Sequence, residues 1–237
     1  MKWKKYKKGD DYSYAFGAFP TGELLAHNKE QVVEILFSED FHEKEEWIRR
    51  LEQEHIAYRV SDKAVQRLAN KGNIYVIGVF RTQLEQSRNN NHVVLDHISD
   101  MGNLGNIIRT MLAMDCYDLI TIGSCCDIYD PRTVRASMGA VFSIRHSHFE
   151  SYEEYRRAFP EERNVFCFLL AERGSTPLPN ILGEGCWSLI FGNEGSGLAK
   201  EYEEIGTSVR IPQSEHVDSL NLTTAVAIGL YHFQYIK

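Results

Sequence analysis

Residues 187–198 read WSLIFGNEGSGL, a mostly apolar run that leads directly into three closely spaced glycines. A short run of this kind before a glycine-rich turn is typical of a strand buried inside a sheet. The loop lacks the GK[ST] ending of a Walker motif, and Glu194 would repel phosphate oxygens. An acidic residue in the first turn of a helix is the alternative interpretation of Glu194. We expect this loop to suit a ligand that carries positive charge or hydroxyl groups.

Further short runs of apolar or β-branched residues surround this one and are separated by segments with helical periodicity. Strands that crossover helices bury on both faces form a parallel sheet, whose ligands bind beyond the carboxyl ends of the strands. The sequence therefore predicts an α/β fold with its chemistry in the loops that follow the runs. These runs are VVLDHI at 93–98, DLITIG at 118–123, AVFSIRH at 140–146, NVFCFLL at 164–170 and SVRIP at 208–212.

The first third of the chain alternates helical and extended patterns on a smaller scale. Helices are predicted at 21–27, 43–55 and 62–70, and strands at 32–40, 57–60 and 74–80, which together make a small α/β/α unit. Residues 81–92, RTQLEQSRNNNH, are polar and without periodicity, as in a linker. We place the domain boundary near residue 88, giving domains at 1–88 and 89–237.

Composition excludes several classes of protein. No apolar stretch approaches the ~20 residues that a membrane span needs, and the basic start MKWKKYKK does not lead into a signal core, so a cytoplasmic protein without membrane contact is expected. The five cysteines have no CxxC spacing, and His146 and His148 lack a nearby third ligand. We therefore expect no metal site.

The formal net charge of −7 argues against a protein that coats nucleic acid non-specifically. Residues 1–8 are nevertheless rich in lysine, with Trp3 and Tyr6 between the lysines, a pattern suited to phosphate contact with occasional base stacking. A frayed, solubilising tail is the alternative interpretation of this segment. With Arg132 and Arg135, the lysines from Lys2 to Lys8 are our candidates for a local RNA-binding surface.

Two more loops carry polar residues in positions where a ligand could bind. In SDMGNLGNIIRT, residues 99–110, Asn103 is a candidate helix cap and Arg109 lies about two turns further on. In IPQSEHVDSLNLTTAVAIGLYHF, residues 211–233, Ser219 or Asp218 is expected to cap a largely apolar helix. Each loop on its own is compatible with an ordinary turn and cap.

The three loops together, in this order and spacing, resemble the signature motifs of the SpoU (TrmH-like) RNA ribose 2′-O-methyltransferases of the SPOUT superfamily. The resemblance covers residues from about 93 to the C-terminus, and ASMGAVF at 136–142 also fits it. More loosely, the N-terminal part resembles the ribosomal-protein-like RNA-binding domain that precedes the catalytic domain in members acting on ribosomal RNA. Gln213 departs from the family pattern, in which Met commonly follows the proline of the third motif.

The resemblance implies S-adenosylmethionine as methyl donor, a deep trefoil knot in the C-terminal domain and a homodimer packed through that knot. It implies catalytic roles for five residues: Arg109, Asn103, Glu194, Ser219 and Asn221. It places the cofactor against six: Gly192, Asn193, Gly195, Ile211, Leu220 and Asn221. The role of Arg109 stays open between general base and phosphate binding, although a guanidinium is a poor proton acceptor.

The expected substrate is RNA, and ribosomal RNA is favoured over transfer RNA because of the appended N-terminal domain. The alternatives are a transfer RNA ribose methyltransferase, a catalytically silent RNA-binding dimer and a nucleotide-binding α/β protein. Methylation of RNA in the presence of S-adenosylmethionine distinguishes the first expectation from the last two.

Overall fold

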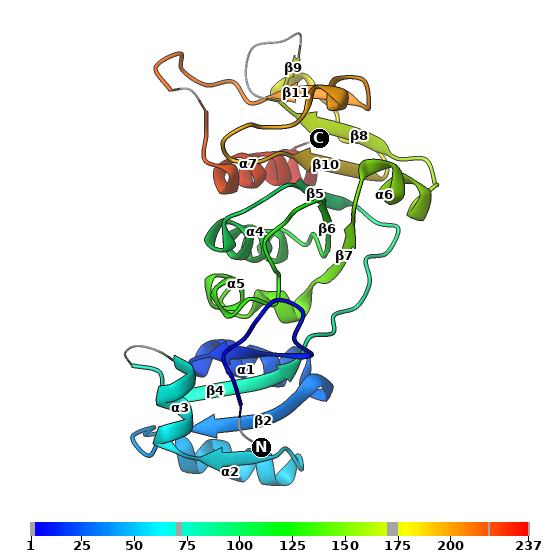
Figure 1. Ribbon diagram of the computed structural model, residues 1–237. Coiled ribbons are helices and arrows are strands. Elements are labelled where there is room, and N and C mark those ends of the chain that lie inside the picture. Colours follow the sequence, from blue (N-terminus) through cyan, green and yellow to red (C-terminus); the bar gives the residue numbers. More distant parts are fainter. Residues whose placement is uncertain (1–2, 70–72, 170–174, 218, 237) are drawn as a thin grey trace. The chain divides into compact units, whose positions relative to one another are not determined.

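The structure is a computed structural model that describes residues 3–69, 73–169, 175–217 and 219–236. Lys2 and Asp218, both named above, lie outside the described residues. The chain forms two compact units, one from residues 1–83 and 127–143 and the other from residues 84–126 and 144–237 (Figure 1). The expected domains, residues 1–88 for RNA binding and residues 89–237 for methyl transfer, stay a prediction.

The first unit is built on a four-stranded sheet with the order β1-β4-β2-β3. The central strand β4 pairs antiparallel with both β1 and β2, and β3 is parallel to β2 at the edge. Every described residue of β4 except the last is buried, which explains the unbroken apolar run of its sequence. The strands are β1 Tyr12–Phe16, β2 Val32–Phe37, β3 Tyr58–Val60 and β4 Val76–Arg81.

Helices cover both faces of this sheet, as the α/β/α prediction requires. Leu25 of α1 and Leu51 of α2 pack with Ile35 and Phe37 on one face. On the other face Val65 of α3 packs with neighbouring apolar side chains of the sheet. The helices are α1 Ala18–His27, α2 Lys44–Gln53, α3 Asp62–Ala69 and, from the later stretch of this unit, α5 Pro131–Ala136; short 3₁₀ turns η1 and η2 occupy Lys29–Gln31 and Ala140–Ser143.

The second unit is built on a seven-stranded sheet with the order β7-β6-β5-β10-β8-β11-β9. All its strand pairs are parallel, so the predicted parallel sheet is confirmed. Strands β5, β6 and β10 are buried at every residue, as expected when helices cover both faces. The strands are β5 His92–Asp96, β6 Asp118–Ile122, β7 Arg145–Phe149, β8 Asn164–Phe168, β9 Thr176–Pro177, β10 Trp187–Phe191 and β11 Thr207–Arg210.

Helices α4 and α7 pack against each other (Figure 1). Helix α6 packs with Tyr202 in an apolar cluster that includes Val94 and Ile190 of the sheet. The helices of this unit are α4 Met101–Ala113, α6 Tyr152–Ala158 and α7 Leu222–Tyr235, with 3₁₀ turns η3 Leu178–Asn180 and η4 Lys200–Glu203. The sheet is thus the middle layer of three.

The expected strand at 140–146 is wrong in its first half. Residues Ala140–Ser143 form a 3₁₀ turn after Gly139, whose φ is +83°, and the strand begins only at Arg145. Phe142 packs edge-on against Phe80 of β4 with ring centroids 4.9 Å apart. The apolar run reflects the packing of a helical turn in the first unit, so periodicity over so short a run could not identify it. The short strands β1 and β9 were missed altogether.

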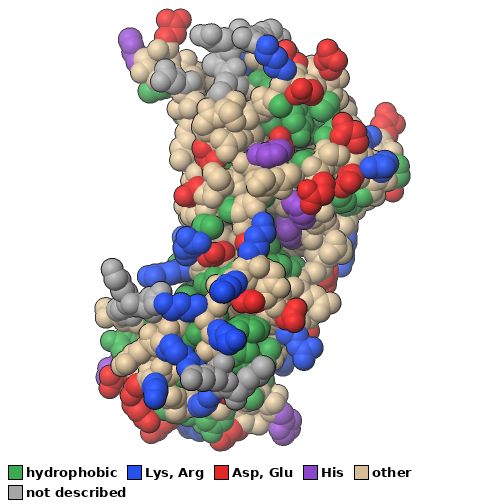
Figure 2. All heavy atoms as spheres, viewed as in Figure 1, with side chains coloured by type: hydrophobic (Ala, Val, Ile, Leu, Met, Phe, Trp, Pro, Cys, Tyr) green, Lys and Arg blue, Asp and Glu red, His purple; other side chains and the backbone are tan. Residues whose placement is uncertain are grey.

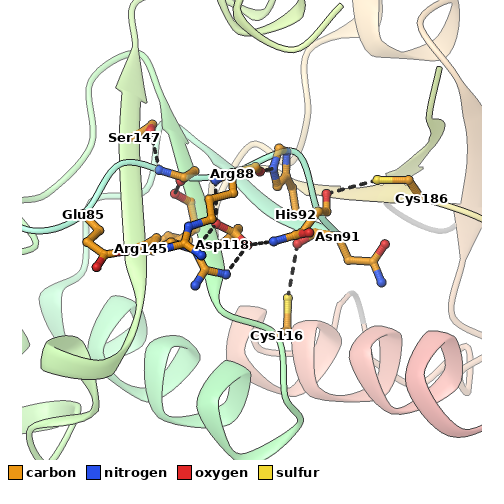
Figure 3. A network of polar contacts seen from close by, with 12 residues as sticks. Glu85, Arg88, Asn91, His92, Cys116, Asp118, Arg145, Ser147 and Cys186 are labelled. Carbon is orange, nitrogen blue, oxygen red and sulfur yellow. Dashed lines mark hydrogen bonds and ion pairs between the residues drawn. The ribbon is translucent and has the colours of Figure 1, made fainter. Parts of the chain in front are cut away.

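A row of polar residues lies at the amino ends of three neighbouring strands of the large sheet. His92, Asp118 and Arg145 begin β5, β6 and β7 and are paired in register (Figure 3). Asp118 is buried and accepts hydrogen bonds from Arg145 Nε at 2.7 Å and Nη2 at 2.6 Å. The backbone N–H of Arg88 also donates to Asp118, at 2.8 Å, so the expected linker is held along the edge of the sheet. Burial alone would raise the pKa of Asp118, but these hydrogen bonds lower it.

Candidate active site

A pocket lies beyond the carboxyl ends of β8, β10 and β11, where a parallel sheet places its ligands. It has a volume of about 640 Å³, part of which is open to solvent. Its floor includes Phe168 and Phe191, stacked with ring centroids 4.3 Å apart. The lining consists of Phe168, Leu169, Phe191, Gly192, Asn193, Glu194, Gly197, Ile211, Gln213, Ser219, Leu220, Leu222 and Ala225.

The loop after β10 folds back on itself to form one wall of this pocket. Asn193 and Gly197 form an isolated bridge, and the Gly197 N–H donates to the Asn193 carbonyl at 2.9 Å. A Cβ on Gly192 would stand only 2.3 Å from the carbonyl carbon of Gly197, so only glycine allows this approach. The Asn193 side chain accepts from the Gly195 N–H at 2.9 Å and donates to the His97 carbonyl at 2.9 Å. The asparagine thus fixes the loop to the end of β5.

Glu194, the acidic residue of that loop, meets a residue of the first motif. Asn103 Nδ2 donates to Glu194 Oε1 at 3.1 Å, and both side chains are half-buried. Asn103 is not the helix cap: α4 begins two residues earlier, at Met101, and the Asp100 carboxylate accepts from the Asn103 N–H at 2.7 Å. Freed from capping, the Asn103 side chain is available to position the glutamate.

The third motif contributes further lining residues of the pocket and the start of α7. Ser219 and Leu220 line the pocket, whereas the side chain of Asn221 caps the helix by accepting from the Thr223 N–H at 2.9 Å. The expected cap at Ser219 is therefore wrong, because the helix starts at Leu222. Gly229 lies against the rings of Phe168 and Phe191, and a Cβ there would come within 2.9 Å of Phe168. Close packing of α7 thus supports the aromatic floor.

The structure places six of the ten expected site residues in the lining of the pocket, with four exceptions. Gly195 is exposed at the tip of its loop, and Asn221 faces its own helix terminus. Arg109 lies on the exposed side of α4, and its side chain has no partner among the described residues. Asn103 reaches the pocket wall through Glu194.

Sequence reasoning missed the apolar part of the site. Phe168 and Phe191 are the last residues of β8 and β10, and Leu222 and Ala225 lie in the first turns of α7. Their place at the carboxyl ends of predicted strands was a usable signal for the two phenylalanines. Gln213 was noted only as a departure from the family pattern.

The model of the SpoU rRNA Methylase family matches residues 90–231, more than half of the chain, and the range includes all three motif loops. The chain belongs to the SpoU rRNA Methylase family. The resemblance inferred from the motifs is therefore confirmed.

Curated relatives in the SpoU rRNA Methylase family align with the same region. The 23S rRNA (adenosine(1067)-2′-O)-methyltransferase of Streptomyces azureus is 34% identical over 149 residues, which cover 61% of this chain and 54% of that protein. The 23S rRNA (guanosine(2553)-2′-O)-methyltransferase RlmP of Bacillus subtilis is 28% identical over 145 residues, covering 60% and 57%. The chain spans about half the length of the curated relatives it matches.

A solved structure resembles nearly the whole chain, including the part that precedes the SpoU match. The AdoMet-bound rRNA methyltransferase from Sinorhizobium meliloti has a TM-score of 0.79 and 27% identity, and the match covers 94% of this chain and 87% of that one. The predicted α/β class with a large parallel sheet is confirmed by the strand pairing and by this likeness. The trefoil knot stays a prediction, because strand order alone does not trace how the chain is threaded.

Two further observations concern other kinds of site. Among the described residues, no group of three or more His, Cys, Asp or Glu side chains is arranged to hold a metal ion. No helix in the described part of the chain is long and apolar enough to cross a membrane.

Proposed function

We propose that this protein is an S-adenosylmethionine-dependent RNA methyltransferase that acts on a ribose 2′-hydroxyl of ribosomal RNA. The observation that carries the proposal is the charge of the pocket. Among the described residues that line it, Glu194 is the single charged side chain. A pocket with only negative charge suits a methyl donor that carries a sulfonium and an ammonium group. It disfavours a nucleoside triphosphate.

The shape of the pocket also fits this donor. The close approach at Gly192 leaves backbone groups of the loop exposed to the cavity, and such groups can read an adenine or the amino-acid end of the donor. The stacked Phe168–Phe191 pair supplies apolar surface beside them. When bound, the donor would supply an electrophilic methyl group. The chain's own task is to hold an RNA hydroxyl in line with it, and positioning of this kind can supply several kcal/mol of catalysis.

Glu194 and Asn103 are proposed to perform that positioning. Their hydrogen bond joins the loop after β10 to the first turn of α4, so a hydroxyl bound there meets an oriented carboxylate. Arg109, exposed on the same helix, is proposed to bind an RNA phosphate and to stabilise the ribose oxygen as its proton passes to solvent. Ser219 and Asn221 complete the proposed set, with Asn221 acting through the start of α7.

Ribosomal RNA is preferred as substrate over transfer RNA. The relatives described above are named for 23S rRNA, and the structural likeness to the rRNA methyltransferase extends through the first unit. We propose that residues 1–88 bind RNA and that residues 89–237 hold the donor and the catalytic groups. The protein would act in the cytoplasm, where ribosomal RNA is processed, and without a metal ion.

A homodimer packed through the second unit is proposed from one face of α7. Tyr231, Tyr235 and Ile236 of this region expose 54%, 53% and 50% of their surface, and Ile228 exposes 37%. All of them except Tyr235 line an apolar groove that also contains Leu178 and Pro179. An exposed apolar face of this kind marks an interaction site, and a second copy of the chain is the partner that the family resemblance implies. Light scattering should give twice the mass of the chain, and Tyr231→Lys should shift it toward the monomer.

The decisive experiment mixes purified protein, methyl-labelled S-adenosylmethionine and deproteinised ribosomal RNA. We expect label in RNA at a ribose oxygen and no transfer to the same sequence carrying a 2′-deoxy nucleotide at the target. Binding of RNA without any transfer would favour the catalytically silent dimer. Calorimetry in which ATP binds and S-adenosylmethionine does not would favour the nucleotide-binding alternative.

A further inference from the structure

The amino-terminal segment, residues 3–9, is held firmly on the first unit although it contains no helix or strand. We call this segment the strap. Trp3 is only 5% exposed and packs in the core cluster with Tyr14, Leu36 and Val65. Its Nε1 donates to Glu34 Oε2 at 2.6 Å, and its ring meets Tyr12 edge-on at 4.9 Å. A frayed tail is therefore the wrong interpretation of this segment.

Three more hydrogen bonds fasten the strap along its length. Arg67 Nη2 donates to the Trp3 carbonyl at 2.8 Å, and the Tyr14 hydroxyl donates to the Lys4 carbonyl. Further on, the Tyr6 hydroxyl donates to Asp127 Oδ2 at 2.5 Å, and burial together with this contact raises the pKa of Tyr6. Both aromatic side chains are thus occupied as anchors. The expectation that they stack on bases is wrong, because Trp3 is buried and Tyr6 is bound.

The lysine residues of the strap are exposed, whereas its aromatic residues hold it in place. Lys4, Lys5, Lys7 and Lys8 are all exposed. The last two sit on a tight turn in which the Asp10 N–H donates to the Lys7 carbonyl at 3.0 Å and the Lys7 N–H donates to Asp10 Oδ2 at 2.8 Å. Gly9 takes a φ of +92° in this turn, a conformation that favours glycine. Four positive charges are therefore presented on a fixed backbone.

Charge is divided unevenly between the two units. The first unit has 16 lysines and arginines against 15 aspartates and glutamates, a formal net charge of +1, whereas the second has 10 against 18, or −8. Within the first unit, residues 39–54 hold seven of the acids and three of the basic residues. The rest of that unit is correspondingly basic, and Figure 2 shows Lys and Arg side chains gathered on its visible face. An overall acidic protein thus has a local basic surface.

Three carboxylates of the first unit, Glu34, Asp127 and Asp130, have partners among the residues around the strap. Glu34 pairs with Arg59 at 2.5 Å besides accepting from Trp3, and Asp130 pairs with Arg132 at 2.9 Å. Asp127 accepts from the Tyr129 N–H at 2.9 Å in addition to the Tyr6 hydroxyl. Glu34 and Asp127 hold the strap in place, and Asp130 holds Arg132 at the start of α5.

We propose that the strap is a docking surface for the RNA backbone, in which Lys4, Lys5, Lys7 and Lys8 contact phosphates. The proposal deepens the proposed function and rests on it for the identity of the partner. Contacts of this kind release bound counterions, so they tolerate any sequence and weaken steeply as salt rises. Arg135, in α5 of the same unit, is also exposed.

The test compares the full chain with the variant Lys4→Gln/Lys5→Gln/Lys7→Gln/Lys8→Gln, using deproteinised bacterial 23S rRNA as the probe. We expect the Kd for RNA to rise at least tenfold at physiological salt. The slope of log Kd against log salt should also fall by about 3, since each phosphate contact contributes roughly 0.7 to 0.9. A control with the same change in charge, Lys29→Gln/Lys44→Gln/Arg49→Gln/Arg50→Gln, should change the slope by less than one.

A second variant tests whether the lysines must be held on a fixed backbone to bind RNA. Trp3→Ala keeps every lysine but removes the main anchor, so we expect a loss of RNA affinity smaller than that of the quadruple variant. Tyr6→Phe, which removes one hydroxyl, gives a milder release should Trp3→Ala unfold. Equal Kd and equal salt slope for the quadruple variant and its control would overturn the proposal. S-adenosylmethionine binding, measured on the same samples, reports separately on the proposed function, because the strap has no part in the donor pocket.

Discussion

Asn103 Nδ2 lies 3.1 Å from Glu194 Oε1 and joins two motifs that stand 91 residues apart in the chain. The hydrogen bond orients a carboxylate at the edge of a pocket that contains no other charged side chain among its described lining residues. Neither side chain caps a helix or closes a loop. Asp100 caps α4, and Asn193 closes the loop after β10. The pair is thus free to act on a ligand.

Glu194→Gln tests the charge of this pair. Because glutamine keeps the size of the side chain and an oxygen for Asn103, we expect methyl transfer to fall at least tenfold while the free energy of unfolding changes by less than about 1 kcal/mol. Initial rates with labelled donor and urea unfolding curves measure the two effects. A large loss of stability with unchanged transfer would make Glu194 a structural residue.

Gly192→Ala tests the close approach within the glycine loop. The new Cβ would lie 2.3 Å from backbone of Gly197, so the loop must open and we expect donor affinity to fall at least tenfold. Gly195→Ala is the matched control, because its Cβ would meet only Asn193 Oδ1 at an ordinary 3.5 Å. Calorimetric titration with S-adenosylmethionine should separate the two variants; similar affinities would show that the loop does not shape the donor site.

Arg109→Ala tests the exposed cation on α4. If Arg109 stabilises charge on the RNA during transfer, the turnover number should fall by about 10² to 10³, whereas donor binding should remain as in the parent protein. Arg157→Ala, on the exposed side of α6, is the control for a general loss of positive charge. Unchanged turnover in the Arg109 variant would remove this residue from the proposed mechanism.

We expect the buried His92 side chain to make the free energy of unfolding depend on pH. Its Nε2–H donates to the Arg88 carbonyl at 2.6 Å, so Nδ1 must accept from Arg163 Nη1 at 2.5 Å and from the Tyr155 hydroxyl at 2.8 Å. Burial lowers the pKa of His92 from 6.5 to about 4, and a proton on Nδ1 would break both contacts.

Between these two pKa values the unfolded chain binds a proton that the folded chain does not. The contribution of His92 to stability is therefore fully present above pH 6.5 and is lost as the pH falls toward 4, by an amount of the order of 3 kcal/mol. His92→Gln should flatten the loss of unfolding free energy over this range relative to the parent. The exposed His42→Gln variant should follow the parent curve; parallel curves for all three would refute the assignment.

Local patterns in the sequence predicted much of the sheet, and together with the family resemblance they predicted about half of the residues that line the pocket. The run WSLIF became β10 because a fully buried strand needs apolar side chains on both faces, and NVFCFLL became β8, whose last three residues are buried. Gly192 and Glu194 could also be assigned to a ligand-binding loop from local sequence. The absence of a side chain at a glycine and the charge of a glutamate are properties of single residues.

Tertiary structure decided what depends on distant partners. Asn103 turned from a cap into a partner of Glu194, Trp3 and Tyr6 became anchors, and the run AVFSIRH split between a 3₁₀ turn and β7. The stacked Phe168–Phe191 floor likewise exists only because β8 and β10 are neighbours in the sheet. A sequence specifies which residues prefer burial, hydrogen bonding or a turn. Which partner satisfies each preference is settled only when the chain has folded.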